Sequence, residues 1–212
     1  KVFTTLPTKT GAASRCARRM RPFGPSASSS NAVWPGRPVR LRAASSNAAS
    51  LSDAWADAGL DRQPGEGETR DDWGCIWGTA LGGIQTFERG YKDIWLKGRE
   101  RLSPLSVVMS MNNAVNAHIS LQLGLGGVSS SHTAACASSA IAIGEAYRRI
   151  RAGDAEVMLT GGSDATQTYG VAQGWLAMRL MSPDVGDAAA QACRPFAADR
   201  AGLVLGEGGA AL

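Results

Sequence analysis

Apolar and polar positions change period several times along the chain, and each change marks a predicted element. Two short apolar runs bounded by glycine predict buried strands over 74–78 and 156–160. Apolar residues then recur at helical spacing from Ala140 to Ile150, and Gly153-Asp154 ends that predicted helix. The same reasoning predicts helices over 49–58, 84–95, 112–123 and 170–181, and a strand over 202–205 followed by a hairpin or a further strand.

This alternation of strands and helices predicts a layered α/β fold. No internal repeat is visible, and no apolar run reaches the roughly 18–20 residues that a membrane span needs. We therefore expect a globular protein without a membrane-spanning segment. The hydrophobic fraction of 44% and the aromatic fraction of 6% are ordinary for that class.

Cys136 lies where a predicted strand end, VSSSHTAAC (128–136), turns into the predicted helix. In the first turn of a helix, a thiol meets unpaired N–H groups and the positive end of the helix dipole, which favour the thiolate. The small neighbours Ala135 and Ala137 leave room for a bulky group on the sulfur. From these residues alone, two interpretations remain open: a reactive nucleophile or an inert core cysteine.

The net charge of +4 hides a strong asymmetry. Residues 1–50 hold nine basic side chains and no Asp or Glu, whereas the remaining residues hold 13 basic and 18 acidic ones. The basic charges of this head are not gathered on a helix or interleaved with aromatic residues, so we expect no nucleic-acid binding.

The few metal-ligating side chains show no zinc spacing, so we expect reduced thiols and no metal site. These residues are Cys16, Cys75, Cys136, Cys193, His118 and His132.

The segment TAACASSAIAIGEAYRRIRAGDAEVMLTGGSDA (133–165) resembles the nucleophile region of the β-ketoacyl-acyl carrier protein synthases, the condensing enzymes of fatty acid and polyketide synthesis. Three more segments are similar to family motifs in the same order: DWGCIWGTALGGIQTF (72–87), RLSPLSVVMSMNNAVNAHISLQLGLGG (101–127) with Asn113 at the family's asparagine, and CRPFAADRAGLVLGEGGAAL (193–212). The resemblance implies a thiolase-like α-β-α architecture, of which the chain holds only the N-terminal half and stops in mid-motif.

The resemblance also implies a function in fatty acid biosynthesis, of the fatty-acid-elongation type. Cys136 would take an acyl group from a thioester and condense it with malonyl-acyl carrier protein, and its own backbone N–H would be one oxyanion donor. The partners would be acyl carrier protein, acyl and malonyl thioesters and a second copy of the chain, with no cofactor. The family's decarboxylating histidines and second oxyanion donor lie in the missing half. Because neither His118 nor His132 stands at those places, we expect the isolated chain not to catalyse condensation.

Three alternatives remain beside this interpretation. A polyketide ketosynthase would share every motif. A non-catalytic partner subunit, like the chain-length factors of aromatic polyketide systems, would lack the nucleophile, so Cys136 counts against it. A thiolase-type acyltransferase is disfavoured by the R-P-F…G-E-G segment over 193–212.

The other prominent residues are interpreted mainly as scaffold. Asp164 is expected to be a structural carboxylate, and a loop-fixing salt bridge is expected among Asp199, Arg200 and Glu207. Ile141 occupies a position that is often His in relatives. Side chains expected to pack beneath the acyl region or at a subunit contact are Trp175, Met178 and Met181. The basic loop residues Lys97, Arg99 and Arg101 would be solvated or would meet an acidic carrier protein.

The predicted domains are a basic head of low order over 1–48 and an incomplete β-ketoacyl synthase N-terminal domain over 49–212. The head has three possible origins: an organelle transit peptide, an incorrectly assigned start of the coding sequence, or a diverged first βα unit. We expect a cytoplasmic protein, or a plastid or mitochondrial one if the head is a transit peptide.

Overall fold

The computed structural model describes residues 54–60, 69–183 and 191–212. The predicted head over 1–48, Cys16 and the start of the first predicted helix lie outside these residues. Within them, 54–166 and 207–212 belong to one compact unit and 167–206 to another. Among the described residues, no helix is both long enough and apolar enough to cross a bilayer.

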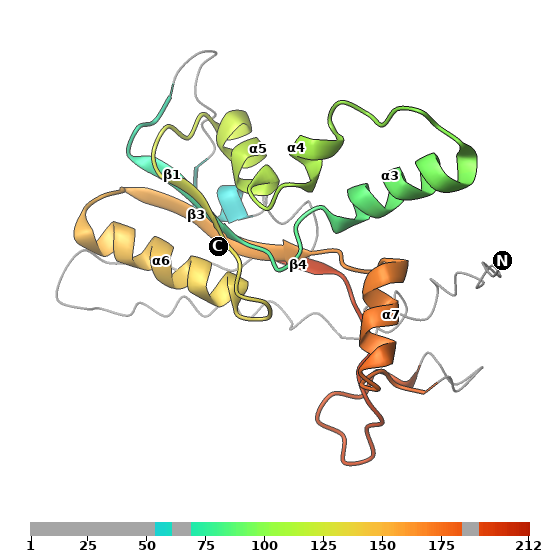
Figure 1. The fold of residues 1–212 in the computed structure, drawn as a ribbon. Helices are drawn as coiled ribbons and strands as arrows, with labels where there is room; N and C mark the ends of the chain where they lie inside the picture. Colours follow the sequence, from blue (N-terminus) through green and yellow to red (C-terminus); the bar gives the residue numbers. More distant parts are fainter. Residues whose placement is uncertain (1–53, 61–68, 184–190) are drawn as a thin grey trace. The chain divides into compact units, whose positions relative to one another are not determined.

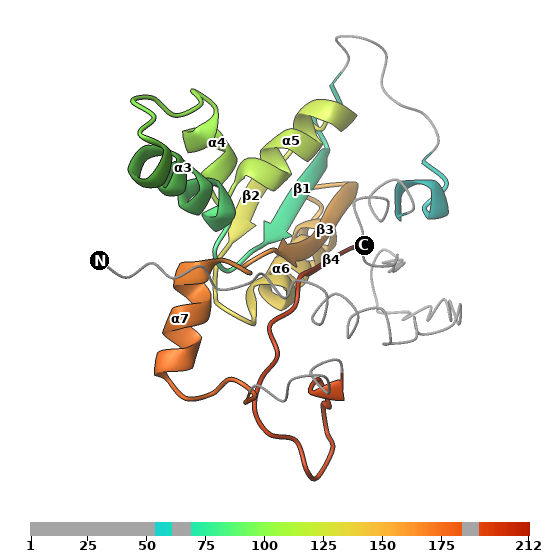
Figure 2. The ribbon, with the colours of Figure 1, turned by 90° about the vertical axis from the view of Figure 1, so that its right-hand side faces the viewer.

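The larger unit is built on a four-stranded sheet (Figure 1). Its strand order is β2-β1-β3-β4, and Figure 2 labels all four strands. Its strands are β1 (Trp73–Gly78), β2 (Ser129–His132), β3 (Val157–Asp164) and β4 (Gly208–Ala211). β1 pairs in parallel with both β2 and β3, and β4 adds antiparallel to β3. The predicted strands over 74–78 and 156–160 are confirmed as β1 and β3, and β3 continues to Asp164.

Helices cover both faces of this sheet, as Figure 2 shows for α5 (Ala114–Leu123) and α6 (Ser138–Ala152). Successive side chains of β1 point to opposite faces. Cys75 and Trp77 pack in one core cluster with Ile119 of α5. The side chain between them, Ile76, packs in a second cluster with Ala142 and other residues of α6. The layered α-β-α prediction is therefore confirmed.

The helix predicted over 84–95 is confirmed as α3 (Ile84–Lys97), which ends at Gly98 in the left-handed conformation with φ 65°. The short helix α4 (Ser106–Ser110) follows it and was not predicted. α3 displays an aromatic stack on its exposed side. The ring centroids of Phe87 and Tyr91 lie 6.2 Å apart, and those of Tyr91 and Trp95 lie 4.9 Å apart.

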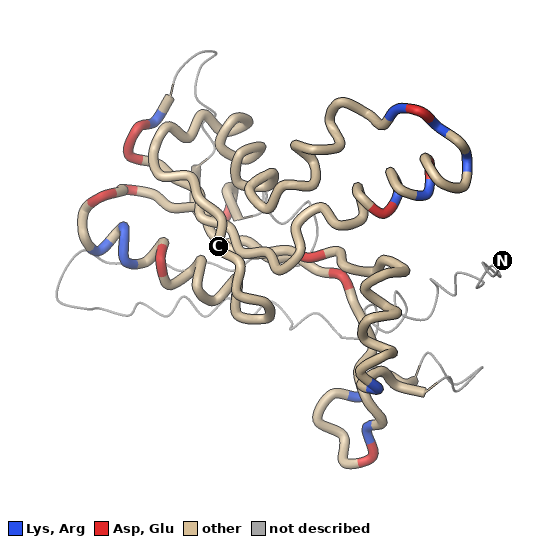
Figure 3. Tube along the Cα trace, viewed as in Figure 1, with Lys and Arg blue, Asp and Glu red and all other residues tan. Residues whose placement is uncertain are grey.

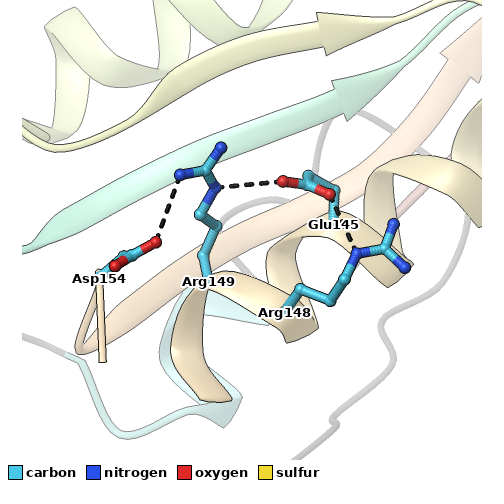
Figure 4. A network of polar contacts seen from close by, with 4 residues as sticks. All are labelled: Glu145, Arg148, Arg149 and Asp154. Carbon is cyan, nitrogen blue, oxygen red and sulfur yellow. Dashed lines mark hydrogen bonds and ion pairs between the residues drawn. The ribbon is translucent and has the colours of Figure 1, made fainter. Parts of the chain in front are cut away.

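Gly153 ends α6 in the left-handed conformation, as predicted from Gly153-Asp154. Just before this cap, Arg149 joins Glu145 and Asp154, with N···O distances of 3.1 and 3.3 Å (Figure 4). Arg148 also contacts Glu145, at 3.1 Å. Hydrogen bonding from Arg148 and the charges of both arginines lower the pKa of Glu145.

The smaller unit contains α7 (Tyr169–Ala177), whose first turn is capped by Thr168 accepting a hydrogen bond from the Val171 N–H. α7 ends before the predicted residue 181, and Arg179 adopts a left-handed φ of 57° just after its end. The predicted strand over 202–205 is wrong: only an isolated bridge joins Leu203 to Met181. The φ of 106° at Gly202 takes the backbone out of the extended region immediately before Leu203.

Candidate active site

Cys136 is an exposed residue in the short connection between strand β2 and helix α6. Residues 134–137 of this connection are called the corner. The residue before Cys136, Ala135, has a φ of 50°. This left-handed conformation costs an ordinary L-residue roughly 1–2 kcal/mol. The corner is therefore strained, and the surrounding structure must hold it in place.

The corner is closed by the buried hydroxyl of Ser138. This hydroxyl accepts a hydrogen bond from the Ala134 N–H at 2.9 Å and donates one to the Ala135 carbonyl at 2.6 Å. The Ala137 N–H donates to the Ala134 carbonyl at 3.0 Å. These three bonds tie both sides of the corner together.

Two glycines let the corner lie directly on the sheet. A Cβ at Gly78, the last residue of β1, would lie 2.4 Å from the Ser139 nitrogen. A Cβ at Gly162 of β3 would lie 2.5 Å from the Ser139 Cβ. Both contacts are closer than side chains tolerate, so the first turn of α6 lies against backbone at the carboxyl ends of two central strands.

Asp164 is a structural carboxylate, as predicted. It lies at the end of β3 and accepts a hydrogen bond from the Thr79 hydroxyl at 2.9 Å. The backbone N–H groups of Ala80 and Leu81 also donate to it. Asp164 thus fixes the turn that follows β1, next to the strand end on which α6 begins.

The predicted placement of Cys136 in the first turn of the helix is wrong. α6 begins at Ser138 with Ala137 as its N-cap, so the cysteine precedes the first helical residue by two positions. The sulfur is still presented at the helix N-terminus on an exposed residue. Among the described residues, no hydrogen bond occupies the Cys136 N–H, which leaves this amide available to a ligand.

Cys136 is the exposed cysteine among the described residues. Cys193 is half-buried and belongs to the smaller unit. Cys75 is fully buried in the sheet, and burial raises the pKa of its thiol to about 12. Because the thiolate is the nucleophile, Cys75 is suited to packing rather than to reaction.

The two histidines do not complete a catalytic pair with Cys136 in the described chain. His132 is the last residue of β2, as predicted for the incoming strand, and its carbonyl accepts a hydrogen bond from the Thr79 N–H at 3.1 Å. His118 is exposed on α5. No hydrogen bond joins either ring to Cys136 among the described residues, and no group of His, Cys, Asp or Glu there could hold a metal ion.

The predicted salt bridge among Asp199, Arg200 and Glu207 has different partners. Asp199 pairs with Arg194, and these residues lie in one loop. The Arg200 guanidinium donates to the Ala197 carbonyl. Glu207 instead accepts a hydrogen bond from the Gln85 amide at 2.9 Å.

Three other groups of predicted residues can be placed individually. Lys97 and Arg99 are exposed and contact Asp93. Arg101 and Ile141 are also exposed. The predicted packing residues of the smaller unit are half-buried at Trp175 and Met181 and exposed at Met178.

Sequence reasoning missed the polar groups that hold the corner. The sequence predicted no supporting role for Ser138, or for Asn112 at the start of the predicted helix over 112–123. The Asn112 amide donates a hydrogen bond to the Thr133 hydroxyl at 2.9 Å. In the sequence, these supporting groups are visible only as hydroxyl and amide side chains, because their hydrogen-bond partners depend on the tertiary fold.

The chain belongs to the β-ketoacyl synthase family, because residues 45–212 match the family's profile, described as "Beta-ketoacyl synthase, N-terminal domain". It is 42% identical over 136 residues to Nodulation protein E of a Rhizobium species. The aligned residues make up 64% of this chain and 32% of that protein. It is 37% identical over 156 residues to 3-oxoacyl-[acyl-carrier-protein] synthase 2 of Staphylococcus aureus. This alignment covers 74% of this chain and 38% of that protein.

A solved β-ketoacyl synthase from Burkholderia phymatum shares the fold, with a TM-score of 0.63 and 29% identity over 77% of this chain and 39% of that one. The chain thus spans about a third of the length of the curated relatives it matches. This coverage agrees with the prediction of the N-terminal half of a thiolase-like fold.

Proposed function

We propose that this chain carries the acyl-accepting half of a β-ketoacyl-acyl carrier protein synthase reaction. The observation that supports it is the exposed Cys136 on a strained corner at the start of α6, with a backbone N–H that has no hydrogen-bond partner within the described parts of the chain. The Cys136 thiolate attacks the thioester carbonyl of an acyl carrier protein. A new sulfur–carbon bond forms, the carrier's sulfur–carbon bond breaks, and the carrier thiolate leaves and takes up a proton.

The tetrahedral intermediate of this step carries a negative charge on the former carbonyl oxygen. The Cys136 N–H is the donor in this chain that lies beside the reacting sulfur, and it would stabilise this oxyanion. The positive end of α6 acts in the same direction, because the cysteine lies just before its first turn.

The complete reaction of the whole protein is the condensation of the Cys136-bound acyl group with malonyl-acyl carrier protein in fatty acid biosynthesis. This proposal is supported by the 37% identity to a 3-oxoacyl-[acyl-carrier-protein] synthase 2. The malonyl half needs groups that promote loss of carbon dioxide. His118 and His132, the two histidines of this sequence, are unsuited to that role, because one is exposed on α5 and the other ends β2.

The experiment treats the chain with an acyl-loaded carrier protein and follows the intact mass of the chain. We expect one acyl group, mapped to Cys136 by peptide mass spectrometry and lost in Cys136→Ala. Cys193→Ala is the matched control and should acylate at the wild-type rate. Acylation that persists in Cys136→Ala, or a wild-type chain that takes up no acyl group, would contradict the proposal.

We further propose that the carrier protein docks on the exposed basic loop over 97–101. In Figure 3, which colours the Cα trace by residue type, Lys and Arg positions recur at the end of α3 and just after it. Lys97 and Arg99 contact Asp93 at 2.6 and 3.4 Å, and these contacts lower the pKa of that carboxyl. Because solvent screens exposed ion pairs of this kind strongly, an acidic partner could replace Asp93 at little cost.

Arg101→Glu tests this docking site, because Arg101 is exposed and makes no ion pair among the described residues. We expect slower acylation by the acyl carrier protein at low salt and an unchanged rate with a small acyl thioester. An equal effect on both donors would assign the loss to the fold, and no effect on either would exclude the loop as the docking site.

A homodimer is also proposed, with the second copy adding at strand β2. β2 is an edge strand of the described sheet and therefore has backbone groups available on one side. Sedimentation equilibrium over a range of concentrations should show a dimer, and a monomer throughout would contradict this assembly.

A further inference from the structure

We propose that Asn112 is a positioning residue for Cys136, a role that rests on the acyl-transfer function proposed above. Asn112 lies between α4 and α5, far from the cysteine in sequence. Its side-chain amide donates a hydrogen bond to the Thr133 hydroxyl at 2.9 Å. Thr133 follows the last residue of β2 and leads directly into the corner, three residues before Cys136.

Asn112 lies directly against Gly82 on its other side. A Cβ at Gly82 would lie 2.3 Å from the Asn112 Oδ1 and 3.2 Å from its Cα. Only glycine lets the amide lie so close, and Gly82 also has a left-handed φ of 53°. The amide therefore lies between the turn after β1 and the segment that precedes the cysteine.

The turn that supports Asn112 is fixed to the sheet by hydrogen bonds. The Gly82 N–H donates to the Thr79 hydroxyl at 3.0 Å, and this hydroxyl donates to Asp164 at 2.9 Å. A continuous series of contacts thus runs from the end of β3, through the turn and Asn112, to Thr133. The series connects the rigid strand ends to the approach to Cys136.

This support acts just upstream of the bonds that close the corner. The buried Ser138 hydroxyl of α6 bonds the Ala134 N–H and the Ala135 carbonyl, which belong to the two residues before Cys136. On the approach, the last backbone bond of the sheet edge joins the Thr79 N–H to the His132 carbonyl. Thr133 lies between that bond and the bonds from Ser138, and among the described residues its side chain accepts the hydrogen bond from Asn112.

Loss of the Asn112 bond would let Thr133 shift and the left-handed Ala135 relax. The Cys136 sulfur and N–H would then move away from the positions in which both can contact the carbonyl group of the same thioester. Errors of about 1 Å in such geometry reduce rates strongly. Asn112 touches no reacting atom, so its effect is exerted entirely through Thr133 and the corner.

The first experiment measures the rate of Cys136 alkylation by iodoacetamide in the full chain, together with its acylation by an acyl carrier protein. The variants are Asn112→Ala, Thr133→Val and their combination. We expect each single change to slow both reactions about fivefold, the effect of one neutral hydrogen bond, with no further loss in the combination. Gln122→Ala is the matched control, because this exposed amide of α5 lies outside the contacts described here, and it should react at the wild-type rate.

A second variant exchanges the two side chains, Asn112→Thr with Thr133→Asn, so that an amide and a hydroxyl again face each other without a new charge. Recovery of the alkylation rate relative to Asn112→Ala and Thr133→Val supports a positioning bond. Equal loss in the single and exchanged variants would assign the effect to packing and overturn the proposal. If Asn112→Ala does not fold, as judged by circular dichroism, the comparison of the exchanged variant with Thr133→Val decides alone.

The two readouts separate this inference from the proposed function. A wild-type chain that is not acylated, but whose Cys136 alkylation still depends on Asn112, would refute the acyl-transfer function and leave the positioning role intact. A wild-type chain that is acylated at a rate unchanged by Asn112→Ala would keep the function and overturn the positioning role.

Discussion

The contact between Gly78 and the first turn of α6 gives the most direct test of how the corner is built. In Gly78→Ala, the new Cβ would lie 2.4 Å from the Ser139 nitrogen and 2.5 Å from the Ser138 carbonyl carbon and the Ser139 Cα. All three neighbours are backbone atoms and cannot rotate away. Because ordinary contact begins at 3.4 Å, the helix start must retreat from the sheet by about 1 Å.

Overpacking of this kind costs about 1–3 kcal/mol. With a urea dependence of about 2 kcal/mol per molar, the unfolding midpoint should fall by roughly 0.5–1.5 M. The helix start carries the Cys136 corner with it, so the alkylation rate of Cys136 should fall as well. The matched control is Gly144→Ala in the same helix, where a Cβ would meet nothing within 4 Å. This control should gain about 0.5–1 kcal/mol from helix propensity.

Urea unfolding followed by circular dichroism measures the stability of both variants, and mass spectrometry of alkylated chain measures the reactivity of Cys136. Opposite shifts of the two midpoints are expected. A Gly78→Ala chain that unfolds at the wild-type midpoint and keeps its Cys136 reactivity would show that α6 does not rest on the end of β1 as described.

Three further predictions follow from other contacts. Asp164→Asn should cost about 1–3 kcal/mol in urea unfolding, because one amide oxygen cannot accept from Thr79 and two backbone N–H groups; an unchanged midpoint would remove Asp164 from the scaffold. Ser138→Ala should cost a similar amount and also slow Cys136 alkylation, and full reactivity in this variant would contradict its role in closing the corner. Burial raises the pKa of Cys75 from 9.0 to about 12, so the stability that its protonated thiol contributes is complete below pH 9.0 and is lost as the pH rises toward 12. Unfolding midpoints measured across that range should fall less steeply in Cys75→Ala, and identical slopes would refute the buried-thiol account.

Hydrophobic periodicity predicted correctly the elements whose burial repeats along the chain. β1 and β3 are apolar between glycines, and α6 follows the helical pattern from Ala140 to its stop at Gly153. The start of α6 was placed incorrectly because no cap signal marks it. Ala137 has no capping side chain, and the Ser138 hydroxyl bonds backward to the corner instead of forward into the helix.

The sequence predicted which residue is the candidate nucleophile but not the contacts that support it. The small residues and the family-like motif around Cys136 led to that prediction, and its reactivity stays a proposal. The partners of Asp164 could not be read from the sequence, because Thr79 lies 85 residues away. The bond from Asn112 to Thr133 likewise depends on a glycine close approach that only the folded turn creates.

The order of strands in the sheet also governs how this chain can fold while it is being synthesised. β1 is made first, yet both of its neighbours, β2 and β3, are made much later. At about 5–20 residues per second, several seconds pass before the ribosome has made the residues that pair with β1. During that interval, its apolar run over 73–78 has no sheet partner and is open to chaperones or to other nascent chains. Slow translation between β1 and β3 should therefore lower the yield of soluble chain more than slow translation after β3.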